Sequence, residues 1–152
     1  MKDMSDPTVR HSVCERLSRL QPDTRALWGR MTSSQMVCHL NDSFLACLGE
    51  KEVSPATGLL QRTVMKWFAL NVPIPWPKGL RTRPEVEQGA GGTAPIDFSR
   101  DRNELIRTIE RFCCPDPALG SHPHPFFGLM STQEWLRWAY LHTDHHLRQF
   151  GL

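Results

Sequence analysis

Two histidines near the C-terminal end of the chain, His142 and His146, are four residues apart in a segment with a helical pattern of apolar residues. This spacing places them one turn apart on the same helix face. At about 100° per residue they belong to a stripe roughly 80° wide. The stripe consists of Trp135, Ala139, His142, His146 and Gln149. Because it contains Trp135 and Ala139, we expect it to face the core, with His145 outside it at the rim.

A metal ion would satisfy both of these histidines. Two imidazoles that face a protein core are costly unless they find polar partners. A pair of histidines at positions i and i+4 is also the ligand geometry of helical zinc sites. Metalloproteases of this type carry a glutamate directly after the first histidine, and here Thr143 stands in that place. The pattern therefore indicates a metal site without the general base of a protease.

A third ligand must come from another helix, and His39 is the best placed histidine. Apart from His11 near the N-terminus, it is the only histidine within any of the other predicted helices. The residues that share its face are small or of mixed character, which suits a cavity: Gln35, Met36, Ser43 and Ala46. Three neutral imidazoles with an open fourth position are typical of a catalytic zinc site. The residues alone leave open a hydrogen-bonded histidine cluster without metal.

The composition indicates one soluble globular domain over residues 1–152. Hydrophobic residues make up 39%, charged residues 22%, and the net charge is only +2, which argues against a nucleic-acid partner because such binding needs a concentrated basic face. No apolar run approaches the roughly 20 residues of a membrane span, and we see no secretory signal. The five cysteines form no CxxC motif. We expect free thiols and a cytoplasmic location.

Five segments have a helical pattern, and none has a convincing strand pattern. We predict helices over residues 7–20, 32–48, 59–70, 99–113 and 131–150. The second and fifth begin with capping boxes, formed by Thr32 with Gln35 and by Ser131 with Glu134. For the fourth we expect the cap near Ser99. Prolines exclude a helix over residues 72–79.

This order of elements predicts an all-α fold. The first, second, fourth and fifth helices would form a four-helix bundle. The third helix and the proline-rich segment would form a long crossover between the second and fourth, a connection known in such bundles.

Several motifs carry a resemblance to a known family. They are Trp-Gly-Arg-Met-Thr at 28–32, Gln-Met at 35–36, His-Leu-Asn-Asp at 39–42, Pro-Trp-Pro-Lys-Gly at 75–79, His-Pro-Phe-Phe-Gly at 124–128, and the stretch 142–151, His-Thr-Asp-His-His-Leu-Arg-Gln-Phe-Gly. The chain resembles the DinB-like superfamily, and within it a branch of uncharacterised domains. In the general superfamily a glycine often precedes the final glutamine. Here Arg148 does, as in the uncharacterised branch.

The resemblance implies an up-down-down-up four-helix bundle that is often dimeric. It implies a metal held by one histidine of the second helix and a histidine pair of the last helix. Carried over to this chain, these are His39, His142 and His146, the residues already chosen from helical geometry. Characterised relatives include transferases and isomerases that use low-molecular-weight thiols. The expected partners are therefore a small-molecule substrate or thiol and a second copy of the chain.

We thus expect a metal-dependent enzyme with zinc or nickel, and transferase-like or hydrolase-like chemistry. Candidate partners for the imidazole N–H groups are Gln35, Asp42, Ser43 and Gln149, while Asp144 and His145 are rim candidates for proton transfer. Two alternatives stay open. One is a non-enzymatic helical module, as a monomer or a dimer, whose histidines are a relic or a hydrogen-bonded core. The other is a protein that only senses or stores its ion.

Overall fold

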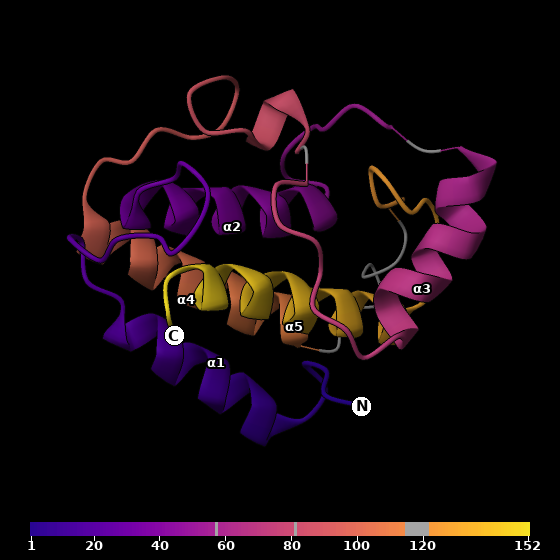
Figure 1. Cartoon of the computed structure of the whole chain (residues 1–152), viewed down its shortest axis with the longest axis horizontal. Helices are drawn as coiled ribbons and strands as arrows, with labels where there is room; N and C mark the ends of the chain where they lie inside the picture. Colours follow the sequence, from indigo (N-terminus) through magenta and orange to yellow (C-terminus); the bar gives the residue numbers. More distant parts are fainter. Residues whose placement is uncertain (57, 81, 115–121) are drawn as a thin grey trace.

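The chain is all-helical. The computed structural model describes residues 1–56, 58–80, 82–114 and 122–152, and within these ranges it contains five α-helices and no β-strand (Figure 1). The helices are α1 (Pro7–Arg19), α2 (Ser33–Cys47), α3 (Lys66–Asn71), α4 (Phe98–Cys113) and α5 (Thr132–Gln149). All five predicted helices and the all-α class are confirmed. An isolated bridge joins His124 to Gly128.

Side-chain caps fix the starts of the two helices that carry the histidine cluster. Before α2, the Thr32 hydroxyl accepts from the Gln35 amide and the Gln35 side chain accepts from the Thr32 amide. Ser131 and Glu134 make the same reciprocal pair before α5. Both predicted capping boxes are confirmed. Each one satisfies two backbone N–H groups that the helix itself leaves unpaired.

The start of α4 differs from the prediction. The cap is Asp97, whose carboxylate accepts from the Arg100 amide at 2.8 Å. Ser99 lies inside the first turn. The physical reason is that the carboxylate of Asp97 caps the orphan amides and also complements the positive end of the helix dipole, so the cap lies two residues earlier than predicted.

The third predicted helix exists but has an unusual start. Gln61–Met65 form a π-helical turn, which leads into α3. Of the residues in these two elements, only Leu70 is buried. The segment stands at one side of the molecule, outside the group formed by the other helices (Figure 1).

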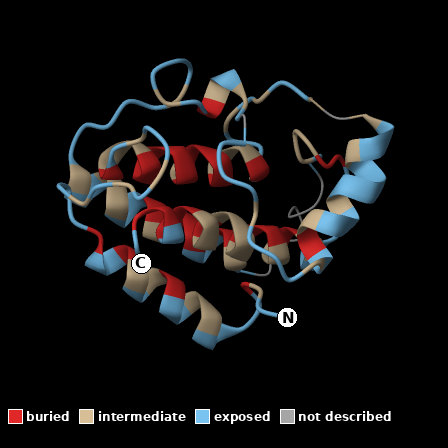
Figure 2. Ribbon diagram, in the orientation of Figure 1, coloured by how far each residue is buried: buried red, intermediate tan, exposed pale blue. Residues whose placement is uncertain are grey.

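The core lies where α1, α2, α4 and α5 meet. Helix α2 packs on α4 and contacts α5, and α1 packs on both α4 and α5. Aromatic rings fill the centre: the Phe44 ring lies 5.0 Å from that of Phe112 and 5.9 Å from that of Trp138, measured between centroids. Buried residues accordingly line the facing sides of these helices (Figure 2). Burial of such large apolar side chains is the main stabilising contribution to a fold of this size.

Two stretches of the long connection between α2 and α4 lie against the helices. Trp76 donates from its indole nitrogen to the Ala69 carbonyl at 3.0 Å. Further along, both carboxylate oxygens of Asp42 in α2 accept from Thr93, one from its amide and one from its hydroxyl, each at 2.7 Å. The connection is thereby held against α2, the helix that carries His39. No helix in the described ranges is long and apolar enough to cross a membrane.

Candidate metal centre

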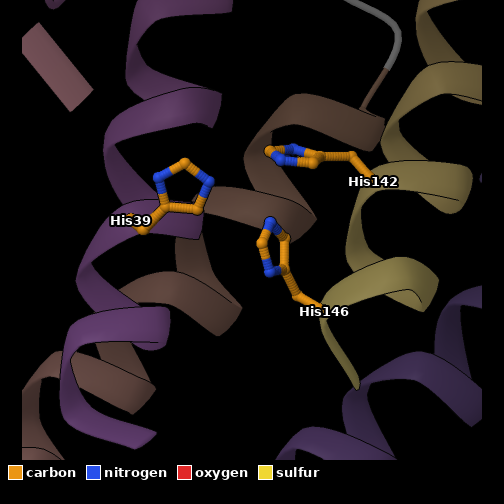
Figure 3. Close-up of side chains that lie close together, drawn as sticks. All are labelled: His39, His142 and His146. Atoms are coloured by element: carbon orange, nitrogen blue, oxygen red, sulfur yellow. The ribbon is translucent and has the colours of Figure 1, made fainter. Parts of the chain in front are cut away.

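The structure brings His39, His142 and His146 together. His39 projects from α2, and the other two project from successive turns of α5 (Figure 3). Their ring centroids lie 4.8 Å apart for His39 and His146, 4.9 Å for His142 and His146, and 5.4 Å for His39 and His142. One ring nitrogen from each of the three lies within 4.8 Å of the others. Three potential ligands thus face one point between two helices.

A hydrogen-bond chain fixes the orientation of the His146 ring. Nδ1 of His146 lies 2.9 Å from Oε1 of Gln149, and Nε2 of Gln149 donates to the Trp28 carbonyl at 2.8 Å. Because the Trp28 oxygen can only accept, the Gln149 amide must present its oxygen to His146. Nδ1 of His146 therefore carries the proton, and its Nε2 has the lone pair that a metal requires.

The ring of His39 is held in the same way by a backbone group. Its Nδ1 lies 2.9 Å from the Val86 carbonyl oxygen, so Nδ1 donates and Nε2 has the free lone pair. Val86 belongs to the short 3-10 turn Pro84–Val86 in the connection that Asp42 ties down through Thr93. Asp42 is itself only 1% exposed and pairs with Lys51 at 2.9 Å. Asp42 therefore acts on the cluster by positioning this turn.

His142 differs from the other two because one of its ring nitrogens is unsatisfied. Nδ1 of His142 is inaccessible to solvent and has no hydrogen-bond partner among the described residues. The ring lies against Trp138, with centroids 4.9 Å apart, and faces Trp76 at 6.2 Å. No hydrogen bond at Nδ1 fixes which nitrogen of His142 carries the proton, so in this ring, unlike in the other two, either nitrogen can present the lone pair.

The three imidazoles are neutral at pH 7. Burial lowers the pKa of His39, and it lowers the pKa of His142 and His146 well below the ordinary value. The proximity of the rings adds to this effect, because a proton on one would repel a proton on the next. Neutral imidazole is the form that binds metal. The site therefore offers lone pairs without first having to release protons.

The dimensions of the cluster fit one ion. Metal–nitrogen distances of roughly 2.1 Å in tetrahedral geometry separate the ligand atoms by about 3.4 Å. The present separations of up to 4.8 Å therefore need to close by on the order of 1 Å, which small side-chain rotations achieve. Three imidazole nitrogens suit zinc, nickel, copper or iron better than magnesium or calcium, which prefer oxygen ligands.

His145 lies beside the cluster. Its ring centroid is 5.2 Å from that of His146, 6.1 Å from that of Trp28 and 6.3 Å from that of Trp76. Partial burial and the nearby Arg148 lower its pKa. A cavity of about 290 Å³ is lined by His145 and Trp76, together with Tyr140 and Asp144 among others. The cavity thus reaches His145 at the rim, while none of the three clustered histidines lines it.

The remaining predicted residues have other contacts. The Gln35 side chain serves in the capping box, and the Ser43 hydroxyl donates to the His39 carbonyl rather than to an imidazole. The Asp144 carboxylate accepts from Arg16 at 2.7 Å, which fixes α5 against α1. Of the proposed imidazole partners, Gln149 alone bonds to a ring nitrogen. The residues that our sequence reasoning missed, Val86 and Trp28, contribute backbone carbonyls, for which side-chain identity gives no signal.

These features define the class of the protein: an all-helical chain with a buried cluster of three histidines that could hold a metal ion. Residues 7–151 match the model of a family described as a protein of unknown function (DUF1569). The chain belongs to this family. No curated protein and no solved structure matches it.

Gln149 is expected to control metal affinity through His146. Replacing Gln149→Ala removes the acceptor of the Nδ1 proton, and loss of such a partner typically weakens metal binding about 10- to 100-fold. Gln149→Glu keeps an acceptor and should retain most of the affinity. Gln133→Ala, an exposed glutamine on the same helix, is the matched control. Competition titration with a zinc chelator measures all three variants. Unchanged affinity in Gln149→Ala would show that the hydrogen bond does not orient a ligand.

His124 is expected to make the folded state sensitive to acid. Its Nδ1 accepts from the amides of Phe126 and Phe127, and burial lowers its pKa to about 3. The unfolded chain, with a histidine pKa of about 6.5, therefore binds more protons as the pH falls below that value, so the free energy of unfolding decreases. Urea unfolding in chelator at pH 7 and pH 5 tests this. Between pH 7 and pH 5, the free energy of unfolding of His124→Asn, which keeps an acceptor, should fall by about 2 kcal/mol less than that of the wild type. An identical fall in both proteins would contradict the prediction.

Proposed function

We propose that the protein is a metal-dependent enzyme in which His39, His142 and His146 hold one divalent ion, zinc or nickel. The observation that carries this proposal is the arrangement of the ring nitrogens. Two rings have their Nδ1 atoms bonded away from the shared point, and the third has a buried Nδ1 without a partner. Without an ion, the Nε2 lone pairs of His39 and His146 would face each other in the buried cluster.

The proposed chemistry follows from the neutral donor set. Bound to three uncharged imidazoles, a divalent ion keeps its full charge, and it can polarise a carbonyl or lower the pKa of a water or thiol. His145 is the candidate for moving a proton, because it is neutral at pH 7 and its ring nitrogen can accept one. The rings of Trp28 and Trp76 beside it would keep water away from the reacting groups.

The proposed substrate is a small molecule or a low-molecular-weight thiol. The cavity of about 290 Å³ beside His145 supports a ligand of that size, since its volume is just below the range of about 300–1,000 Å³ for small-molecule sites. Transferase-like or hydrolase-like chemistry is consistent with this arrangement and with the resemblance of the chain to thiol-using relatives.

We also infer the finer fold from the resemblance. The helices α1, α2, α4 and α5 would form one DinB-like domain over residues 1–152, with the up-down-down-up order, and the segment 48–97 would be its long crossover. The packing of α2 on α4 and of α1 on α4 and α5 supports this inference. A cytoplasmic location and a homodimer without nucleic-acid or membrane partners belong to the same proposal.

Metal titration of untagged protein tests the site. After treatment with chelator, the wild type is expected to bind one equivalent of zinc or nickel, measured by calorimetry and by elemental analysis after gel filtration. His142→Ala removes one of three ligands and should weaken binding at least about 100-fold. His11→Ala, an exposed histidine on α1, is the control and should bind as wild type does.

Two outcomes would contradict the proposal in different ways. Binding of less than about a tenth of an equivalent by correctly folded wild-type protein would exclude a metal site of useful affinity. Full binding by His142→Ala would show that the ligands are others. A screen of the loaded protein for thiol transfer and ester hydrolysis then separates an enzyme from a protein that stores or senses its ion: enzyme activity must disappear with chelator and in His142→Ala.

A further inference from the structure

The segment 59–71 exposes an apolar face that other segments do not cover. Six large hydrophobic side chains of the π-helical turn and α3, with the two residues before them, are between 40% and 82% exposed. They are Leu59, Leu60, Val64, Met65, Trp67 and Phe68, and we call them the α3 face. Several of them recur at spacings of three and four, so they gather on one side of the helix. Figure 2 shows this segment as mostly exposed at the edge of the molecule.

Two charged side chains of the same segment, Lys66 and Arg62, contact other parts of the protein. Lys66 pairs with Glu134 at 2.9 Å, donates to the Leu129 carbonyl at 3.1 Å and is only 19% exposed. The carbon chain of Arg62 lies against Gly128, where an added Cβ atom would be 3.1 Å from Arg62 Cγ. An ordinary surface helix has the opposite arrangement, with charges outward and apolar residues inward. The α3 face itself therefore consists of apolar side chains, with the exposed Arg62 beside it.

The area of this face is close to what a stable dimer needs. Because a large aromatic side chain buries about 150–250 Å², the six residues at their observed exposures offer roughly 600–700 Å². Leu129, which is 72% exposed and lies next to Lys66, extends this area. A standard protein–protein interface buries about 800 Å² on each partner, and the largest apolar patch of an ordinary monomer is smaller, about 300–600 Å².

We propose that the α3 face is the interface through which two copies of this chain form a two-fold symmetric dimer. A two-fold contact places the same patch on itself, and the six residues of the α3 face carry no charge that would meet its own copy. Trp67 and Phe68 would supply the aromatic anchors that dominate such interfaces. A helix that binds a membrane surface is rich in cations on its polar face, whereas this segment has two, of which Lys66 is paired with Glu134. The inference does not depend on the metal.

The oligomeric state of the full chain tests this proposal. Light scattering during gel filtration and sedimentation velocity at micromolar concentrations should give twice the chain mass of 17.4 kDa. Trp67→Glu places a charge in the centre of the face and should raise the dimer dissociation constant at least about 100-fold. Ile96→Glu is the matched control, since Ile96 is 77% exposed and lies outside the α3 face. Circular dichroism checks that both variants remain helical.

Three results would overturn the proposal. They are a wild type that is still monomeric at about 100 μM, above the μM-to-pM range of standard interfaces, a dimer that Trp67→Glu leaves intact, and a monomer that sediments with phosphatidylcholine or phosphatidylserine vesicles. In the last case the α3 face would be a membrane contact. The metal titration of the same preparations is read separately, so failure of the dimer and failure of the metal site remain distinguishable.

Discussion

Three neutral imidazoles can share one buried point only if something else determines which nitrogen of each ring carries its proton. In this protein the hydrogen bonds at Nδ1 do so for two of the three. His146 donates to Gln149, and His39 donates to the Val86 carbonyl. Each bond directs a lone pair at Nε2 toward the partner rings. The proposed ligand set, the neutral charge of the site and its proposed chemistry all depend on this arrangement.

The same bonds explain why loops far from α2 and α5 in sequence are tied to the cluster. Gln149 can orient His146 only because its own amide is oriented by the Trp28 carbonyl, in the connection between α1 and α2. Gly29 allows this close approach, since its φ is +83° and an added Cβ would lie 2.5 Å from Gln149 Nε2. On the other side, Asp42 accepts two hydrogen bonds from Thr93, which lies in the same connection as the turn that supplies Val86. Two otherwise irregular connections thus have a definite physical role.

Much of this could be predicted from the sequence where a local rule is decisive. The capping boxes at Thr32 and Ser131 fixed two helix starts, and the spacing of His142 and His146 fixed their common face. The i to i+3 relation of His146 and Gln149 also allowed their contact to be anticipated. The predicted cap of α4 was wrong, because Asp97 caps this helix and not Ser99, which lies two residues further along the chain. The π-helical turn has no composition signal.

Other parts could not be predicted, since they rest on backbone groups or on tertiary contacts. Carbonyl oxygens of Val86 and Trp28 serve as partners, and any residue type could supply them. Asp42 has the residue type expected of an imidazole partner, but the nearby Thr93 and Lys51 occupy its carboxylate. The apolar periodicity of residues 59–70 predicts a helix. The exposure of its apolar side could not be predicted, because periodicity alone does not say which side of a helix is covered.

X-ray absorption at the metal edge tests the central claim most directly. Untagged protein loaded with one equivalent of zinc should show nitrogen or oxygen neighbours at roughly 2.0–2.1 Å, with outer-shell scattering from three imidazole rings. His39→Ala should reduce that number to two. A sulfur shell at about 2.3 Å, or a spectrum that His39→Ala leaves unchanged, would contradict the account, since the ion would then be held by groups other than the three histidines.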